Sequence, residues 1–110
     1  MSFKSSKTID DAINEAAKSA VIVSAAGNDG KESDSQANTY YPAALDGVVS
    51  VMGYGKDAKI YSTSNYGSAY DIVAPGEAIY TAGNYIKGSK VSTYLSDSKG
   101  TSMAAPFVSF

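Results

Sequence analysis

The chain has 110 residues, 44% of them apolar, and its 9 basic and 11 acidic residues give a net charge of -2. This length suits one compact domain, and the scattered lysines form no basic patch of the kind that binds nucleic acid or a membrane surface. The chain contains no cysteine and no histidine, so these residues can form no disulfide, no thiolate metal site and no histidine base. No apolar run approaches the roughly 20 residues of a membrane span, so no membrane helix is predicted. We also expect no export signal in these residues.

The first predicted element is a helix over residues 8–20. Thr8 is placed to cap the amide of Asp11, Asp10 and Asp11 lie at the positive end of the helix dipole, and Lys18 lies near the negative end. One face carries apolar residues at the helical spacing, namely Ile9, Ala12, Ile13, Ala16, Ala17 and Ala20. The periodicity and both ends therefore predict the same helix.

Two β-branched apolar runs follow, at residues 20–25 and 48–52. Each is short and continuous, which is typical of strands buried on both faces of a parallel sheet. Residues 26–30 predict a turn between them, and residues 31–39 predict a polar surface loop.

The carboxyl-terminal half predicts shorter elements. A third strand covers residues 71–74 and a fourth covers 78–81, with Pro75-Gly76 between them. Residues 85–94 predict a hairpin around a Gly-Ser turn, and a final helix should begin at Thr101 or Ser102. Helix and buried strands in this order predict an open α/β sheet, whose sites collect at the carboxyl ends of the strands.

The sequence Gly100-Thr101-Ser102 places a serine at the start of the last helix. Unpaired amides and the helix dipole favour negative charge there, so a developing oxyanion would be stabilised beside the Ser102 hydroxyl. By residue type alone, the plainer interpretation is that Ser102 caps the helix.

Asn28 lies just past the end of the first predicted strand, next to Gly27. Its side-chain amide could donate a hydrogen bond to a tetrahedral intermediate, a contribution of roughly 3 to 4 kcal/mol in one measured case. Taken alone, the sequence Gly-Asn-Asp-Gly is an ordinary turn.

Read together, several segments resemble the subtilisin-like serine proteases across almost the full chain. Gly-Thr-Ser-Met-Ala-Ala-Pro at 100–106 resembles the nucleophile motif of the family, and Ala-Ala-Gly-Asn at 25–28 resembles its oxyanion motif. Further segments in the order of the family are Tyr-Pro-Ala-Ala at 41–44 with Val-Val-Ser-Val at 48–51, Ser-Asn-Tyr-Gly at 64–67, and Asp-Ile-Val-Ala-Pro-Gly at 71–76. The resemblance implies a three-layer α/β fold with a mostly parallel sheet, present here as a partial domain over residues 1–110.

The resemblance also implies roles for single residues. Ser102 would be the nucleophile, its own amide and the side chain of Asn28 would form the oxyanion hole, and Thr101 would support that hole. The segments implied to bind the substrate are Ala25, Ala26 and Gly27, which would line the pocket for the side chain before the scissile bond, and Ser2 and Phe3, which would pair with the substrate backbone.

The sequence departs from the family pattern in two places. Lys4 stands where the family usually has glycine, which puts backbone pairing with an extended peptide at that edge in doubt. Phe107 follows Pro106 where the family usually has a histidine that is not the catalytic one, so this change does not argue against activity.

The catalytic aspartate and histidine of the family have no counterpart in these residues. We expect them to precede Met1 in a longer protein, since the triad order in this family is aspartate, histidine, serine. The chain alone is therefore expected to be inactive, and it is predicted to be the carboxyl-side portion of a catalytic domain that continues beyond both ends. The parent would hydrolyse peptide bonds through an acyl-enzyme.

Three further expectations complete the prediction. Stabilising calcium is common in the family, but Asp29, Glu32 and Asp34 are interpreted as a solvated loop, so no cofactor and no metal ligand is assigned. The parent is expected to be secreted or held at the cell surface. A partial sheet would expose an edge, so self-association is expected through the hairpin near 85–94 or the last helix.

The alternative function is a protein-interaction module, a pseudoprotease without catalysis. The missing histidine favours it. The presence of Ser102, Thr101 and Asn28 together counts against it, because such a module has no chemical reason to keep all three.

Overall fold

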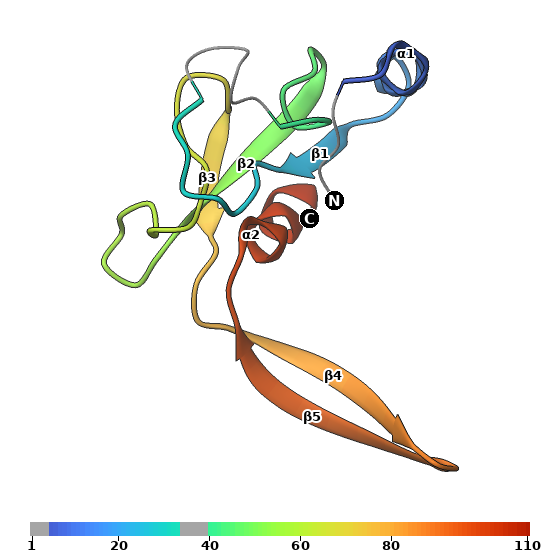
Figure 1. Cartoon of the computed structure of the whole chain (residues 1–110), viewed down its shortest axis with the longest axis vertical. Helices are drawn as coiled ribbons and strands as arrows, with labels where there is room; N and C mark the ends of the chain where they lie inside the picture. The colour runs from blue at the N-terminus through green and yellow to red at the C-terminus, as the bar shows by residue number, and fades with distance from the viewer. Residues whose placement is uncertain (1–4, 34–39) are drawn as a thin grey trace.

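The computed structural model describes residues 5–33 and 40–110 of the chain (Figure 1). The order is a helix, three strands of one sheet, a two-stranded hairpin and a last helix. The bounds are α1 Lys7–Ala17, β1 Ile22–Ala25, β2 Val48–Tyr54, β3 Ile72–Pro75, β4 Ile79–Lys87, β5 Lys90–Ser98 and α2 Thr101–Ser109.

The centre of the molecule is a parallel sheet with the order β1-β2-β3. Helix α2 lies across one face of this sheet (Figure 1). Ala104 of α2 is fully buried and clusters with Val51 of β2 and Ala74 of β3. This arrangement confirms the predicted α/β fold with a mostly parallel sheet.

The two first strands differ in burial, although the sequence predicted both to be buried on both faces. In β2 the buried residues alternate between the faces, with Val48 and Ser50 on one and Val51 on the other. Every residue of β1 is only half-buried, and Val21 just before it is 82% exposed. The prediction is wrong for β1, which lies at an edge of the described sheet. Within the described chain, its residues have a neighbouring strand on one side only and stay partly exposed, whereas β2 has a neighbouring strand on each side.

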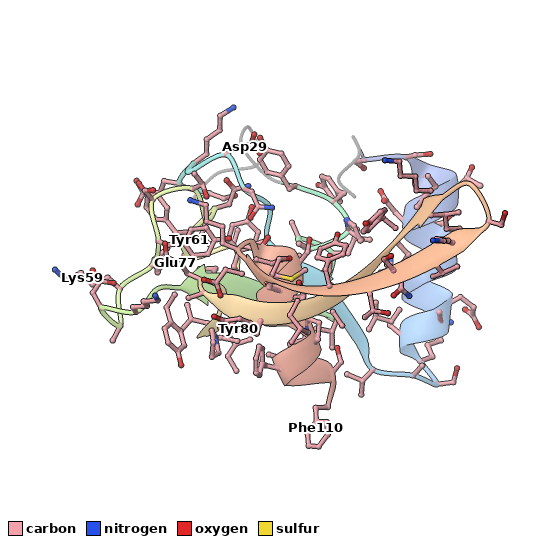
Figure 2. The ribbon with its side chains drawn as sticks, turned by 90° about the horizontal axis from the view of Figure 1, so that it is seen from below. Asp29, Lys59, Tyr61, Glu77, Tyr80 and Phe110 are labelled. Carbon is pink, nitrogen blue, oxygen red and sulfur yellow. The ribbon has the colours of Figure 1, made fainter. Side chains whose placement is uncertain are left out.

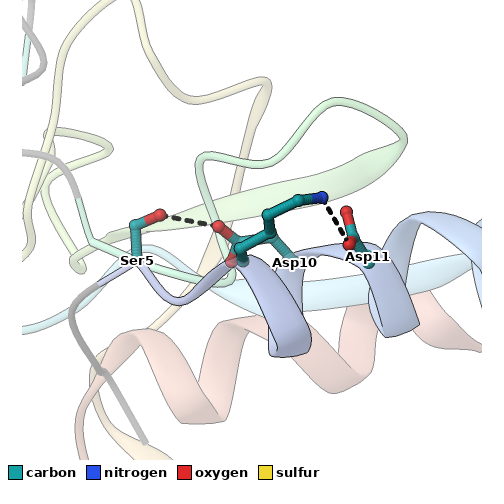
Figure 3. A network of polar contacts seen from close by, with 4 residues as sticks. Ser5, Asp10 and Asp11 are labelled. Carbon is teal, nitrogen blue, oxygen red and sulfur yellow. Dashed lines mark hydrogen bonds and ion pairs between the residues drawn. The ribbon is translucent and has the colours of Figure 1, made fainter.

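Helix α1 is confirmed, but its start differs from the prediction. Ser6 occupies the cap position without a side-chain hydrogen bond, so Thr8 lies inside the first turn and does not cap the helix. The turn is held instead by the Ser5 hydroxyl, which donates to Asp10 Oδ2 at 2.6 Å, and by Lys7 Nζ, which donates to Asp11 Oδ2 at 2.7 Å (Figure 3). No residue of α1 is buried.

The predicted hairpin is confirmed and is longer than expected. Strands β4 and β5 pair over nine residues each, from Ile79↔Ser98 to Lys87↔Lys90. The sequence predicted a separate strand over 78–81, which is wrong because residues 82–84 continue the ladder. Asn84 does not interrupt the strand, since it pairs with Thr93 and accepts a hydrogen bond from its hydroxyl at 2.9 Å.

The hairpin extends away from the sheet and gives the molecule an elongated shape (Figure 1). The radius of gyration is 15.5 Å, compared with about 13 Å for a compact domain of this length. Neither helix of the described chain has both the length and the hydrophobicity that crossing a membrane requires.

Candidate active site

The loop after β1 and the start of α2 meet at one end of the sheet. Gly100 occupies the cap position of α2 at φ 148°, a region that favours glycine, and its amide donates to the Gly76 carbonyl at 2.8 Å. The helix therefore begins at Thr101, and Ser102 is its second residue, with an exposed side chain. Because Gly100 holds the cap position, the interpretation of Ser102 as the cap residue does not describe this helix.

The side-chain oxygen of Asn28 receives hydrogen bonds from the start of α2, 73 residues away. The Thr101 amide donates to Asn28 Oδ1 at 2.8 Å, and the Thr101 hydroxyl donates to the same atom at 3.2 Å. A backbone amide is always a donor, so the atom facing it must be the oxygen of Asn28 rather than its nitrogen. Asn28 Nδ2 therefore lies on the other side, and it makes no hydrogen bond within the described chain.

Thr101 joins the two segments through its side chain as well. It is fully buried, and its hydroxyl oxygen accepts a hydrogen bond from the Gly27 amide at 3.1 Å. The same hydroxyl thus accepts from the residue before Asn28 and donates to Asn28 itself. Removing it would leave the Gly27 amide without this partner and would loosen the loop.

Gly27 is required by the backbone and by a neighbouring side chain. Its φ is 104°, and a Cβ at this position would lie 2.5 Å from Asn65 Nδ2. The family resemblance implies only that Gly27 lines the substrate pocket. The structure gives a reason for glycine itself, because any larger residue would collide with Asn65.

Asn65 is a structural residue of the site that sequence reasoning did not assign a role. It is fully buried, and its Oδ1 accepts hydrogen bonds from the amides of Asp29 at 3.0 Å and Lys31 at 3.1 Å. Its Nδ2 donates to the Ala26 carbonyl at 3.0 Å. Its only signal in the sequence was its place in the Ser-Asn-Tyr-Gly segment, which carried no contact information.

Tyr61 is the second residue that sequence reasoning missed. Its side chain is 7% exposed, and its hydroxyl donates to Asn28 Oδ1 at 2.8 Å. Burial raises the pKa of Tyr61 to about 12, and the charge of Glu77 adds to the rise, while a hydrogen bond involving Thr101 opposes it. Nothing in the residues around position 61 points to this contact.

A charged cleft of about 460 Å³ opens beside Tyr61, and Lys59, Tyr61 and Glu77 are neighbours on this side of the molecule (Figure 2). Its rim also carries Lys56 and Lys99, and Lys99 directly precedes the cap residue of α2. Since Tyr61 contacts Asn28, the cleft adjoins the candidate site.

The predicted substrate-binding residues are only partly described. Ala25 ends β1 and is half-buried, as is Gly27. The side chain of Ala26 is 0% exposed and packs with Ala43 and Tyr70 in a core cluster. Ser2 and Phe3, together with Lys4, lie outside the described residues. The assignment of these positions to substrate binding stays a prediction.

The acidic residues of the loop after Asn28 do not form a metal centre among the described residues. Within residues 5–33 and 40–110 there is no group of three or more carboxylate, histidine or cysteine side chains that could hold a metal ion. Asp34 lies outside that part of the chain. Calcium stays an expectation of the family resemblance, and no chemical step below depends on it.

Comparisons with known proteins agree on one family. The model of the subtilase family matches residues 1–110. The chain is 42% identical over 89 residues to halolysin of Haloferax mediterranei, covering 81% of the chain and 15% of halolysin. It is 38% identical over 102 residues to a thermophilic serine proteinase of Bacillus sp. strain AK1, covering 92% of the chain and 22% of that protein.

The fold is shared with solved structures as well. A structure of proteases from Pseudoalteromonas arctica PAMC 21717 matches with a TM-score of 0.77 and 38% identity, over 98% of this chain and 34% of that one. The chain thus spans about a third of the length of this structure, and less of the two curated relatives.

Proposed function

The chain belongs to the subtilase family of serine proteases, and from that premise we propose that it supplies the nucleophile and the oxyanion hole of a serine endopeptidase. Ser102 is the nucleophile. Its amide and Asn28 Nδ2 are the two donors to the oxyanion, and Thr101 holds Asn28 in place. The catalytic aspartate and histidine come from a part of the protease outside these 110 residues, which contain no histidine.

The proposed reaction proceeds in two steps through an acyl-enzyme. The Ser102 hydroxyl attacks the scissile carbonyl while its proton passes to the histidine, and the negative charge that forms on the carbonyl oxygen is stabilised by the two donors. Collapse of this intermediate expels the amine, which takes the proton from the histidine, and leaves the acyl group on Ser102. Water then attacks the ester with the same base and releases the acid and the free hydroxyl.

The observation that carries the proposal is the hydrogen bond from the Thr101 amide to Asn28 Oδ1, at 2.8 Å. It holds the side-chain oxygen of Asn28 at the residue that precedes Ser102, which supports a donor role for the Nδ2 group on the other side of the amide. An asparagine that merely formed a turn would have no need of a partner 73 residues away.

A fluorophosphonate probe tests the proposal, because it reacts with an activated serine. We expect rapid labelling of Ser102 in the protease that contains this chain with its aspartate and histidine, and no rapid labelling of the 110-residue chain alone. The Ser102→Ala variant of the protease should not be labelled. Rapid labelling of Ser102 in the isolated chain would contradict the claim that the base lies elsewhere.

A pseudoprotease that binds other proteins is the second candidate, and the absence of histidine from the chain favours it. The coding sequence upstream of Met1 separates the two. An open frame with aspartate and histidine motifs supports the protease, and an in-frame stop supports the interaction module.

The proposed partners and location of the protease rest on the family resemblance. We propose that its substrates are polypeptides, and that it acts after secretion or at the cell surface. Fractionation of cells that make the complete protease tests the location, and activity confined to the cytoplasm would contradict it.

A further inference from the structure

Three donors converge on one oxygen atom of Asn28, and only two of them come from the nucleophile segment. The Thr101 amide and the Tyr61 hydroxyl both lie at 2.8 Å from Asn28 Oδ1, while the Thr101 hydroxyl is longer at 3.2 Å. An amide oxygen has two lone pairs, so the two short contacts account for its principal acceptor sites. Tyr61 is thus as close a partner of Asn28 as Thr101 is.

We propose that Tyr61 is a positioning residue of the oxyanion hole, which acts by holding and polarising the side-chain amide of Asn28. The inference rests on the proposed function, because it requires Asn28 Nδ2 to donate to the oxyanion. Tyr61 itself touches neither the nucleophile nor the reacting carbonyl in this role.

The first effect of the Tyr61 hydroxyl is geometric. Asn28 is exposed, so without fixed partners its amide could rotate and present Oδ1 where the oxyanion forms. Donors from two directions, the start of α2 and the loop that carries Tyr61, hold the oxygen on the protein side. A donor that is oriented before the reaction costs no reorganisation in the transition state.

The second effect is electronic. A hydrogen bond to an amide oxygen draws electron density from the amide nitrogen, so its N–H groups become stronger donors. The Tyr61 hydroxyl supplies such a bond at Oδ1, and Nδ2 is the atom that the proposal assigns to the oxyanion. The gain appears when charge develops on the carbonyl oxygen, that is, in the transition state.

The tyrosine ring is itself held rigidly. A Cβ at Gly53 of β2 would collide with Tyr61 Cε1, and one at Gly76 would lie 2.9 Å from the same atom, so two glycines form the slot that admits the ring. The Tyr61 amide also donates to the Gly53 carbonyl at 3.2 Å. Because burial raises the pKa of Tyr61 to about 12, the hydroxyl keeps its proton, and hence its donor role, well into the alkaline range.

A double-mutant cycle in the complete protease tests the inference, with kcat and KM measured for wild type, Tyr61→Phe, Asn28→Ala and the double variant. We expect Tyr61→Phe to lower kcat about three- to tenfold with KM unchanged, as for the loss of one neutral hydrogen bond. Asn28→Ala should lower kcat about 10²- to 10³-fold, which is the loss measured when the oxyanion-hole asparagine is removed from a subtilisin. In the Asn28→Ala background, Tyr61→Phe should have no further effect.

One control variant and one further measurement complete the experiment. Tyr54→Phe removes the hydroxyl of a half-buried tyrosine that makes no side-chain hydrogen bond in the described chain, and kcat should stay within about twofold of wild type. The affinity of a peptide aldehyde, which forms a tetrahedral adduct with the serine, should fall in Tyr61→Phe by the same factor as kcat.

The outcomes separate the two proposals. If Asn28→Ala leaves kcat unchanged, the oxyanion role in the proposed function fails and the role of Tyr61 fails with it. If Asn28→Ala is costly but Tyr61→Phe is neutral, or lowers kcat equally in both backgrounds, only the inference about Tyr61 is overturned. Loss of the fold in Tyr61→Phe would also overturn it, because a positioning role leaves the fold intact.

Discussion

The sheet unit of this molecule buries apolar side chains, whereas the hairpin exposes them. The sheet unit comprises β1, β2, β3, α2 and the loops among them, and the hairpin is β4 with β5. All the buried apolar residues of the described chain belong to the sheet unit, among them Val51 and Ala104 at 0% exposure. In the hairpin, Tyr80, Ile86, Val91 and Leu95 are 66% to 74% exposed.

The hairpin nevertheless has a complete backbone ladder. Its cross-strand pairs place Tyr80, Ala82 with Leu95, and Ile86 with Val91 on one face, while Tyr85 and Tyr94 form a ring contact at 6.4 Å on the other. Regular pairing thus does not by itself bury apolar surface. The candidate site depends on the sheet unit, where Asn28, Thr101, Tyr61 and Asn65 cross-link three segments: the loop after β1, the loop between β2 and β3, and the start of α2.

The largest expected difference between the two regions concerns catalysis. In the complete protease, Ser102→Ala should lower activity by about 10⁴-fold or more, because it removes the proposed nucleophile. Ser92→Ala, a serine-to-alanine change in β5, should leave it within about twofold. Peptide hydrolysis measures both, and a large loss in Ser92→Ala would show that the hairpin belongs to the catalytic unit.

The second difference concerns stability, and the same substitution can be made in both regions. Val51→Ala should lower the free energy of unfolding by about 2 to 3 kcal/mol, because it leaves a cavity beside Ala74 and Ala104. Val91→Ala in the hairpin, where the side chain is 66% exposed, should change it by less than about 0.5 kcal/mol. Urea denaturation gives both values, and equal losses would contradict the contrast in packing.

The third test asks whether another molecule covers the apolar face of the hairpin. We predict that the 110-residue chain self-associates through this face, and that Leu95→Lys weakens association by about 2 kcal/mol, or roughly thirtyfold, since Leu95 is 72% exposed in the single chain. Ser92→Lys, which adds the same charge to the opposite face of the hairpin, is the matched control. Sedimentation that finds a folded monomer at tens of micromolar, as an order of magnitude, would contradict the prediction.

The smallest effect concerns pH. Since the pKa of Tyr61 is raised from 10.0 to about 12 in the folded chain, its contribution to stability is fully present below pH 10 and is lost as the pH rises to about 12. Because solvent near the hydroxyl screens the effect, we expect the loss to be about 1 kcal/mol. Urea denaturation between pH 9 and 12 should show a larger loss in wild type and in Tyr80→Phe than in Tyr61→Phe, where only the other buried tyrosine with a raised pKa, Tyr70, still contributes.

Much of the fold could be predicted from local sequence. The apolar spacing around Ile13 predicted α1, the β-branched runs predicted β1 and β2, and the Gly88-Ser89 turn predicted the hairpin. The start of α1 and the length of β4 could not be predicted, because Ser6 caps no amide through its side chain and Asn84 is kept in the ladder by its partner Thr93. Both features depend on hydrogen bonding in the folded chain, which the secondary-structure propensities of single residues do not predict.

The candidate site divides in the same way. The sequence by itself determined the family and proposed Ser102, Asn28 and Thr101, because a short motif fixes residue types and their order along the chain. Only the tertiary structure decided that Thr101 fixes the amide of Asn28, that Asn65 shapes the loop around Asn28, and that Tyr61 is the third donor to the Asn28 side-chain oxygen. The physical reason is that a hydrogen bond between segments some 30 to 70 residues apart depends on how the sheet brings their ends together, and no pattern along the chain encodes that distance.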